Sequence, residues 1–238
     1  MKETTVNGNT VFVDDNYAHR WLDAIGPDVC KMVEEFVSTP FSGADQMAGW
    51  LATLIEIAGQ STVALVAGSA GGEVLFTTGT NAADGICAQL LGEAFYFGAN
   101  YPTYMGIRFK VSDANQVHAM LGLMITDTTA ETALSDGLYF RIVDESPTLT
   151  FVAENTTAET VVGIGTVLDN TYITAECLYL GGVFYVYVNG NQVAELANGD
   201  PNIPDDEYLT PSLVFHNGEA LAKTMTVDWF RIVQVQAV

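Results

Sequence analysis

Residues 177–196, CLYLGGVFYVYVNGNQVAEL, decide the fold class of this 238-residue chain. They hold two tight-turn signals, Gly181-Gly182 and Asn189-Gly190, and the run between them, Val183–Val188, contains only β-branched and aromatic residues. Gly-Gly and Asn-Gly pairs supply the positive φ angles that type I′ turns require. The stretch therefore predicts a three-stranded antiparallel meander.

The same pattern extends over most of the chain. Short β-prone runs separated by turn residues occur at 62–67, 73–77, 86–91, 106–111, 119–126, 137–143, 149–154, 172–180, 192–196, 210–216 and 225–234. Such spacing is typical of β-sandwiches and barrels. We expect an all-β domain over residues 37–238, in which two antiparallel sheets pack face to face.

Residues 1–36 have a different pattern. Asn16 can cap a short helix, and Gly26-Pro27 would end it. Apolar residues then follow at helical spacing from Val29 to Phe36. The pattern predicts a short, partly helical N-terminal arm, which either packs on its own domain or anchors to a neighbouring protein. Its candidate partner contacts are Trp21, Leu22, Ile25, Met32 and Phe36.

The composition is acidic and poor in charge. The chain has 29 acidic and 8 basic residues, for a net charge of −21, which repels phosphate backbones and anionic lipid surfaces. We therefore expect no nucleic-acid or membrane partner. Only 16% of the residues are charged and 49% are hydrophobic, which fits either a surface covered by a partner or uncharged polar loops.

The cysteines and the N-terminal sequence bear on the compartment. The three cysteines are scattered without a Cys-x-x-Cys pair, and the first residues show no apolar signal segment. We expect the protein to be made in a reducing cytoplasm, with its cysteines serving as small apolar side chains.

Three segments resemble a known fold family. They are GGEVLFTTG at 71–79, the hairpin at 181–196 and MTVDWFRIVQV at 225–235. Together they resemble the concanavalin A-like jelly roll, the sandwich of laminin-G modules, legume lectins, pentraxins and one group of β-glucanases. The resemblance covers residues 37–236 and implies a jelly-roll sandwich.

More narrowly, the chain looks like a group of phage-encoded jelly-roll proteins from virion structural genes. The strands at 71–79, 135–140, 209–213 and 227–231 carry this likeness. It implies a capsid decoration protein on the virion surface, bound to the major capsid protein and itself a homo-oligomer. The alternative is a lectin-like module that binds a glycan.

The sequence offers little for catalysis. Glucanases of this fold need Glu-x-Asp-x-Glu or a close variant on one strand, because alternation then directs all the carboxylates into one cleft. No such triplet occurs, and Asn-Thr-Thr-Ala separates Glu154 from Glu159. His19, His118 and His216 are dispersed along the chain. We therefore expect a non-enzymatic protein with no catalytic residue.

Binding sites are indicated at two places. Three consecutive acidic residues follow Pro204, and these are Asp205, Asp206 and Glu207. They form either a Ca²⁺ site or a solvated loop. Because consecutive side chains point to different sides and Ca²⁺ needs six or more converging oxygens, we favour the solvated loop and expect no cofactor. The aromatic stretch FYFGANYPTY at 95–104 places candidate glycan-binding rings on its outward side, and these are Tyr96, Tyr101 and Tyr104.

Overall fold

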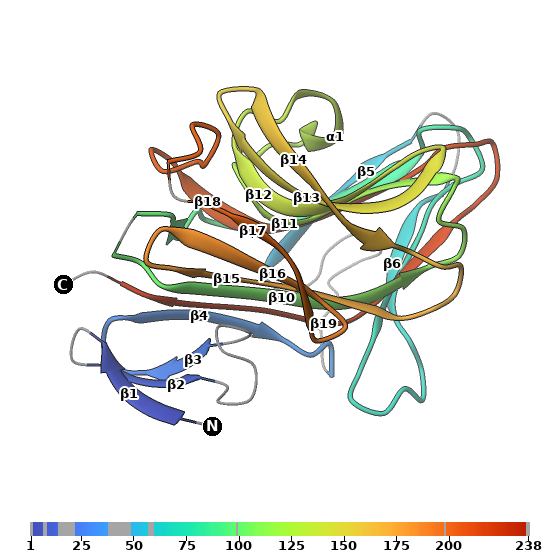
Figure 1. Ribbon diagram of the computed structural model, residues 1–238. Helices are drawn as coiled ribbons and strands as arrows, with labels where there is room; N and C mark the ends of the chain where they lie inside the picture. The colour runs from blue at the N-terminus through green and yellow to red at the C-terminus, as the bar shows by residue number, and fades with distance from the viewer. Residues whose placement is uncertain are drawn as a thin grey trace.

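A computed structural model describes residues 2–6, 9–13, 22–37, 49–56, 60–98, 100–197 and 199–236. Two large antiparallel sheets pack face to face, and a small three-stranded sheet lies against one of them (Figure 1). The predicted all-β sandwich is confirmed. The single helix of the described residues is the one-turn α1, Ala130–Ala133.

The first large sheet, the β10–β19 sheet, has the order β17-β16-β15-β10-β19-β7-β6, and β4 also pairs with β19. Its strands are β4 Val29–Glu34, β6 Thr62–Leu65, β7 Val74–Thr77, β10 Thr103–Val111, β15 Ile173–Leu180, β16 Val183–Val188, β17 Asn191–Leu196 and β19 Thr224–Val235. The predicted meander is β15-β16-β17. Positive φ angles occur at both residues of each predicted turn.

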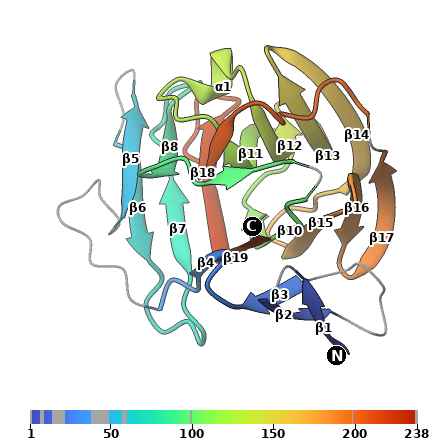
Figure 2. The same cartoon turned by 90° about the vertical axis from the view of Figure 1, so that its left-hand side faces the viewer.

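The second large sheet, the β11–β18 sheet, has the order β14-β13-β12-β11-β18-β8-β5, and β9 also pairs with β18. Its strands are β5 Trp50–Ile55, β8 Gly85–Leu90, β9 Phe95–Tyr96, β11 Val117–Met124, β12 Gly137–Val143, β13 Ser146–Asn155, β14 Ala158–Thr166 and β18 Tyr208–Asn217. Figure 2 shows the two sheets facing each other, with α1 on the outer side of the second sheet near β8, β18 and β11.

The core lies between the two sheets. Alternate residues of each strand point into it, and Phe184 is a typical member, with its ring centroid 4.5 Å from Tyr179, 5.6 Å from Phe97 and 5.8 Å from Phe151. Burial of large apolar side chains on both inner faces is the main favourable term in folding such a sandwich.

The helical prediction for the N-terminal arm is wrong over residues 22–36, whereas Asn16 and the expected start of the first helix lie outside the described residues. The described part of residues 1–36 forms β1 Lys2–Val6, β2 Asn9–Val13, β3 Leu22–Ile25 and β4. β1, β2 and β3 form the small sheet, whereas β4 pairs with β19 over six residues. Pairing with a long neighbouring strand outweighs the helical spacing of the apolar residues. The division at residue 36 stays a prediction.

The candidate partner contacts in this region have different environments. Ile25 is exposed, Met32 packs against the main core, and Phe36 is buried. Trp21 and the side chain of Leu22 lie outside the described residues. Phe36 is therefore no docking side chain, since it is already packed inside its own domain. Within the described ranges, no helix is long and apolar enough to cross a membrane.

Candidate functional site

The polar side chains of the site stand on the outer face of β12. Along this strand Leu138, Phe140 and Ile142 point into the core between the sheets, whereas Tyr139 and Arg141 point the opposite way. The ring of Tyr139 is nevertheless buried, so the outer face is covered at this point.

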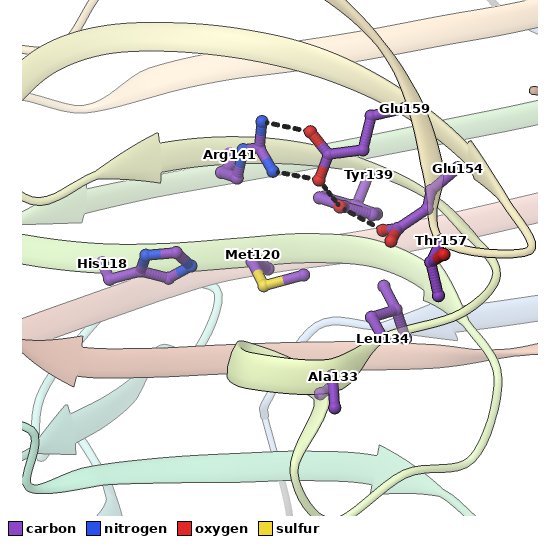
Figure 3. Close-up of a pocket in the computed structure, with 10 residues that line it drawn as sticks. His118, Met120, Ala133, Leu134, Tyr139, Arg141, Glu154, Thr157 and Glu159 are labelled. Carbon is purple, nitrogen blue, oxygen red and sulfur yellow. Dashed lines mark hydrogen bonds and ion pairs between the residues drawn. The ribbon is translucent and has the colours of Figure 1, made fainter.

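The segment between β11 and β12 provides the cover. Ala130 of α1 and Leu134 pack against apolar side chains of the outer face, which are Cys87, Met120, Met124, Tyr139, Val152 and Val214. Beside α1 a pocket of about 270 Å³ remains open, with polar groups along one side (Figure 3). Its size is near the lower end of small-molecule sites, roughly 300–1,000 Å³.

An unusual hairpin turn carries the acidic side of this pocket. β13 and β14 pair so that Glu154 lies directly opposite Glu159. The turn between them places Thr156 and Thr157 at φ angles of 50° and 68°, a left-handed conformation that β-branched residues seldom adopt. Asp136 stabilises this turn, because its Oδ1 accepts a hydrogen bond from the backbone N–H of Thr156 at 3.0 Å.

The two glutamates converge on one phenol. The hydroxyl of Tyr139 donates to Oε2 of Glu154 at 2.7 Å and lies 3.5 Å from Oε1 of Glu159. Glu154 is only 5% exposed. Burial raises the pKa of Glu154, the negative charge of Glu159 raises it further, and the Tyr139 hydrogen bond opposes both effects. Burial and Glu154 also raise the pKa of Tyr139, so its phenol stays protonated and donates.

Arg141 fixes the second glutamate. Its two terminal nitrogens donate to the two carboxylate oxygens of Glu159 at 2.6 and 2.9 Å, a bidentate ion pair (Figure 3). Burial disfavours the charged guanidinium and lowers the pKa of Arg141, but the hydrogen bond and the charge of Glu159 raise it by more, so the pKa of Arg141 is raised overall. Glu159 is exposed at the pocket mouth, whereas Glu154 lies beneath it.

A histidine lies at the other end of the pocket. His118 of β11 is directly opposite His216 of β18, with ring centroids 6.3 Å apart. Burial is the main cause that lowers the pKa of His118 to about 4, and His216 and Arg141 add to it. His118 is therefore neutral at ordinary pH. Its Nε2 and the Nε of Arg141 are buried without a hydrogen-bond partner among the described residues, and both residues line the pocket.

The structure places the three predicted glycan-binding tyrosines in two different environments. Tyr96 and Tyr101 lie together, with ring centroids 5.3 Å apart. Tyr104 faces outward from β10 but is buried, because the N-terminal strands cover it with Val11 and Ala24. Its hydroxyl donates to Glu176 at 2.9 Å. The expected exposure of Tyr104 is therefore wrong.

The predicted calcium candidates lie in an exposed loop. Asp205, Asp206 and Glu207 are all exposed, and Oδ1 of Asp206 accepts a hydrogen bond from Asn155 at 3.0 Å. No group of three or more His, Cys, Asp or Glu side chains with metal-site geometry occurs in the described part of the chain.

The sequence reasoning missed the pocket. It set Glu154 and Glu159 aside because no single strand holds both, but a hairpin brings them together as cross-strand partners. The missing signal was the turn, since Thr156-Thr157 lacks the Gly or Asn that marks a tight hairpin. Tyr139 and Arg141 gave no separate signal in the sequence.

The sandwich is similar to several solved structures. No protein-family model matches the chain, and no curated protein is significantly similar in sequence. A protein of unknown function from Shewanella oneidensis MR-1 has a TM-score of 0.61 at 14% identity, over 88% of each chain. An endo-1,3-β-glucanase from Streptomyces sioyaensis has a TM-score of 0.60 at 10% identity, over 90% of this chain and 99% of that one. The carbohydrate recognition domain of Emp47p has a TM-score of 0.55 at 10% identity, over 82% of this chain and 92% of that one.

At these identities the similarities establish the fold, which is the predicted concanavalin A-like jelly roll. The glucanases contradict the prediction that the chain is not an enzyme, because proteins of this architecture include endo-β-glucanases. That prediction required all the carboxylates on one strand. None of these structures points to a phage capsid role.

Proposed function

We propose that the protein binds a glycan at the outer face of the β11–β18 sheet and cleaves a glycosidic bond there with Glu154 and Glu159. The observation that carries the proposal is the convergence of both carboxylates on the Tyr139 hydroxyl in an open pocket. Structural similarity to glucanases and to a carbohydrate recognition domain supports it.

The environments of the two carboxylates suit different roles. Glycosidases pair a carboxylic acid, whose pKa is raised, with an ionised carboxylate. Glu154 has the raised pKa and is the general acid. Glu159, ion-paired with Arg141, is the carboxylate that reacts at the anomeric carbon.

The spacing favours a retaining reaction. Oε2 of Glu154 and Oε1 of Glu159 lie 2.7 and 3.5 Å from one phenolic oxygen, so these two oxygens are at most 6.2 Å apart. That is below the roughly 6.5–9.5 Å of inverting enzymes and compatible with the roughly 5 Å of retaining ones. Glu159 would bond to the anomeric carbon as the glycosidic C–O bond breaks, and Glu154 would give its proton to the leaving oxygen. Water would then attack the anomeric carbon, return its proton to Glu154 and release Glu159.

The test is hydrolysis of a panel of soluble β-glucans, measured as new reducing ends, with proton NMR to report the anomeric configuration of the first product. Glu154→Gln and Glu159→Gln should each abolish release. Glu195→Gln, an exposed change on β17 in the other sheet, is the matched control. Binding without hydrolysis by the unaltered protein would reject the catalytic role and leave a lectin-like module.

Attachment to a capsid is a separate proposal. It rests on the sequence resemblance alone and includes the major capsid protein as partner, the homo-oligomeric state and the virion surface as location. Saturable addition of the protein to purified capsids, followed by sedimentation, tests it independently of any glycan.

A further inference from the structure

A cluster of tyrosines lies apart from the pocket. Tyr96 of β9, Tyr101 in the loop after it and Tyr208 at the start of β18 form the tyrosine platform. The ring centroid of Tyr96 is 5.3 Å from that of Tyr101 and 5.1 Å from that of Tyr208. Rings from three separate segments thus form one aromatic cluster, in which Tyr101 meets Tyr96 edge to face and Tyr208 lies at a tilt to Tyr96.

The backbone around the platform holds the rings in place. Tyr96 pairs with Tyr208 in the β9–β18 ladder, and the side chain of Gln234 bonds to both the N–H and the C=O of Tyr96. A β-carbon at Gly98 would lie 2.8 Å from the ring of Tyr96 and 3.1 Å from that of Tyr101. The absence of a side chain at Gly98 therefore allows these two rings to meet.

The platform is accessible and is bordered by acceptors. Tyr208 is 53% exposed, and Tyr96 and Tyr101 are half-buried. The exposed carboxylates of Asp205 and Asp206 precede Tyr208 in the same loop. Burial first, and then the charge of Asp205, raises the pKa of Tyr96, so its hydroxyl stays a donor.

This chemistry suits a neutral sugar. The C–H groups on one face of a pyranose pack against aromatic ring faces, as other apolar groups do. The neighbouring carboxylates can accept hydrogen bonds from the sugar hydroxyls. Phosphate-bearing or carboxylated ligands would be repelled by the adjacent acids. A nucleic-acid strand is disfavoured for the same reason, although its bases also stack on aromatic rings.

The platform is structurally linked to the pocket. Asn155 directly follows Glu154, and its side-chain amide donates to the C=O of Ile203 at 3.1 Å and to Oδ1 of Asp206 at 3.0 Å. The β13–β14 hairpin and the loop that leads into β18 accordingly lie at the same end of the sandwich (Figure 1). A chain bound at the glutamates would pass over this loop to reach the tyrosines.

We propose that the tyrosine platform binds additional sugar units of a neutral glycan chain whose reacting unit occupies the pocket. The inference rests on the proposed function, since the pocket supplies the anchored end of the chain. It assigns to Tyr101 and Tyr208 a role in affinity for long chains and no role in the chemical step.

The test measures binding of neutral β-linked glucose oligomers of increasing length to the Glu154→Gln protein by calorimetry. Changing Tyr101 and Tyr208 to Ala should weaken binding of long oligomers by about two- to tenfold for each ring, which is the scale of one aromatic contact. Binding of the shortest oligomers should not change. Tyr185→Ala, on β16 in the other sheet, is the control.

The outcomes separate the two proposals. Equal loss of affinity for short and long oligomers, or no loss, would overturn the platform while leaving the proposed function in place. Length-dependent loss in a protein that hydrolyses nothing would keep the platform and reject the catalytic role. If the Glu154→Gln and unaltered proteins both bind no oligomer, the platform and the proposed function both fail.

Discussion

Replacing Tyr139 by Phe removes one hydroxyl from the centre of the pocket and leaves the ring. The hydroxyl donates at 2.7 Å to the buried carboxylate of Glu154, where it favours the ionised form. The variant loses that donor, while burial and the charge of Glu159 remain. The pKa of Glu154 should therefore rise further above its ordinary value.

The size of the rise follows from the hydrogen bond. A hydrogen bond to a charged group contributes about 1.5–3 kcal/mol, and one pKa unit corresponds to about 1.4 kcal/mol. We expect the pKa of Glu154 to increase by roughly one to two units. Tyr185→Phe, on β16 in the other sheet, should leave it unchanged.

Carbon-detected NMR of the Glu154 carboxyl across a pH series measures this directly. A raised pKa in the native state also means that the native state holds its proton more tightly than the unfolded chain does. The contribution of protonated Glu154 to the stability of the native state is full below the ordinary pKa of 4.5 and is lost as pH rises through the native pKa of Glu154. An unchanged or lowered pKa in the Tyr139 variant would refute the assigned hydrogen bond and the role of Glu154.

Three further predictions concern packing, a buried ion pair and the pH profile. A β-carbon at Gly122 would lie 2.6 Å from the Cα of Tyr139 and closer still to the carbonyl oxygen of Leu138, both on β12, so Gly122→Ala should cost about 1–3 kcal/mol in urea unfolding. Gly163→Ala, which meets nothing within 4 Å, should cost far less. The buried ammonium of Lys223 donates to Asp113 at 2.8 Å, so Lys223→Met should destabilise the protein by about 2 kcal/mol. Because the hydrogen bond with Lys223 lowers the pKa of Asp113, the stabilisation from this pair is present above pH 3.8 and is lost as pH falls through the native pKa of Asp113. An acid titration of unfolding that shows no difference between variant and parent would contradict this prediction. Hydrolysis should decline as pH rises through the raised pKa of Glu154, because the general acid is then deprotonated, and a rate that instead grows in this range would exclude that role.

Much of the fold could be predicted from alternation and turn residues. The expected boundaries of β12 and β16 match the structure. β16 lies between the Gly181-Gly182 and Asn189-Gly190 turns, β12 ends at the Asp144-Glu145 turn, and both strands have one face in the core. β5 and β14 were missed. β14 contains β-branched residues, but Gly163 and Gly165 interrupt them and the strand is largely exposed, so it lacks the buried apolar face that marks a strand in a sequence.

That missed strand also explains why the site could not be predicted. Glu159 lies on β14, and its partnership with Glu154 exists only if the chain reverses at Thr156-Thr157. The turn has no sequence signal of its own, because Asp136, twenty residues earlier, stabilises its backbone. A contact between residues so far apart in sequence is tertiary information, which local propensity does not contain.

The position of β19 constrains how the protein can be made. This strand is synthesised after the other described strands, yet it lies inside its sheet, with β10 on one side and β4 and β7 on the other. Until it emerges from the ribosome, β10 has an unpaired edge and β4 has no partner in the sheet. Pairings between such distant segments form slowly and leave edges open to aggregation, so completion of this sheet waits for β19.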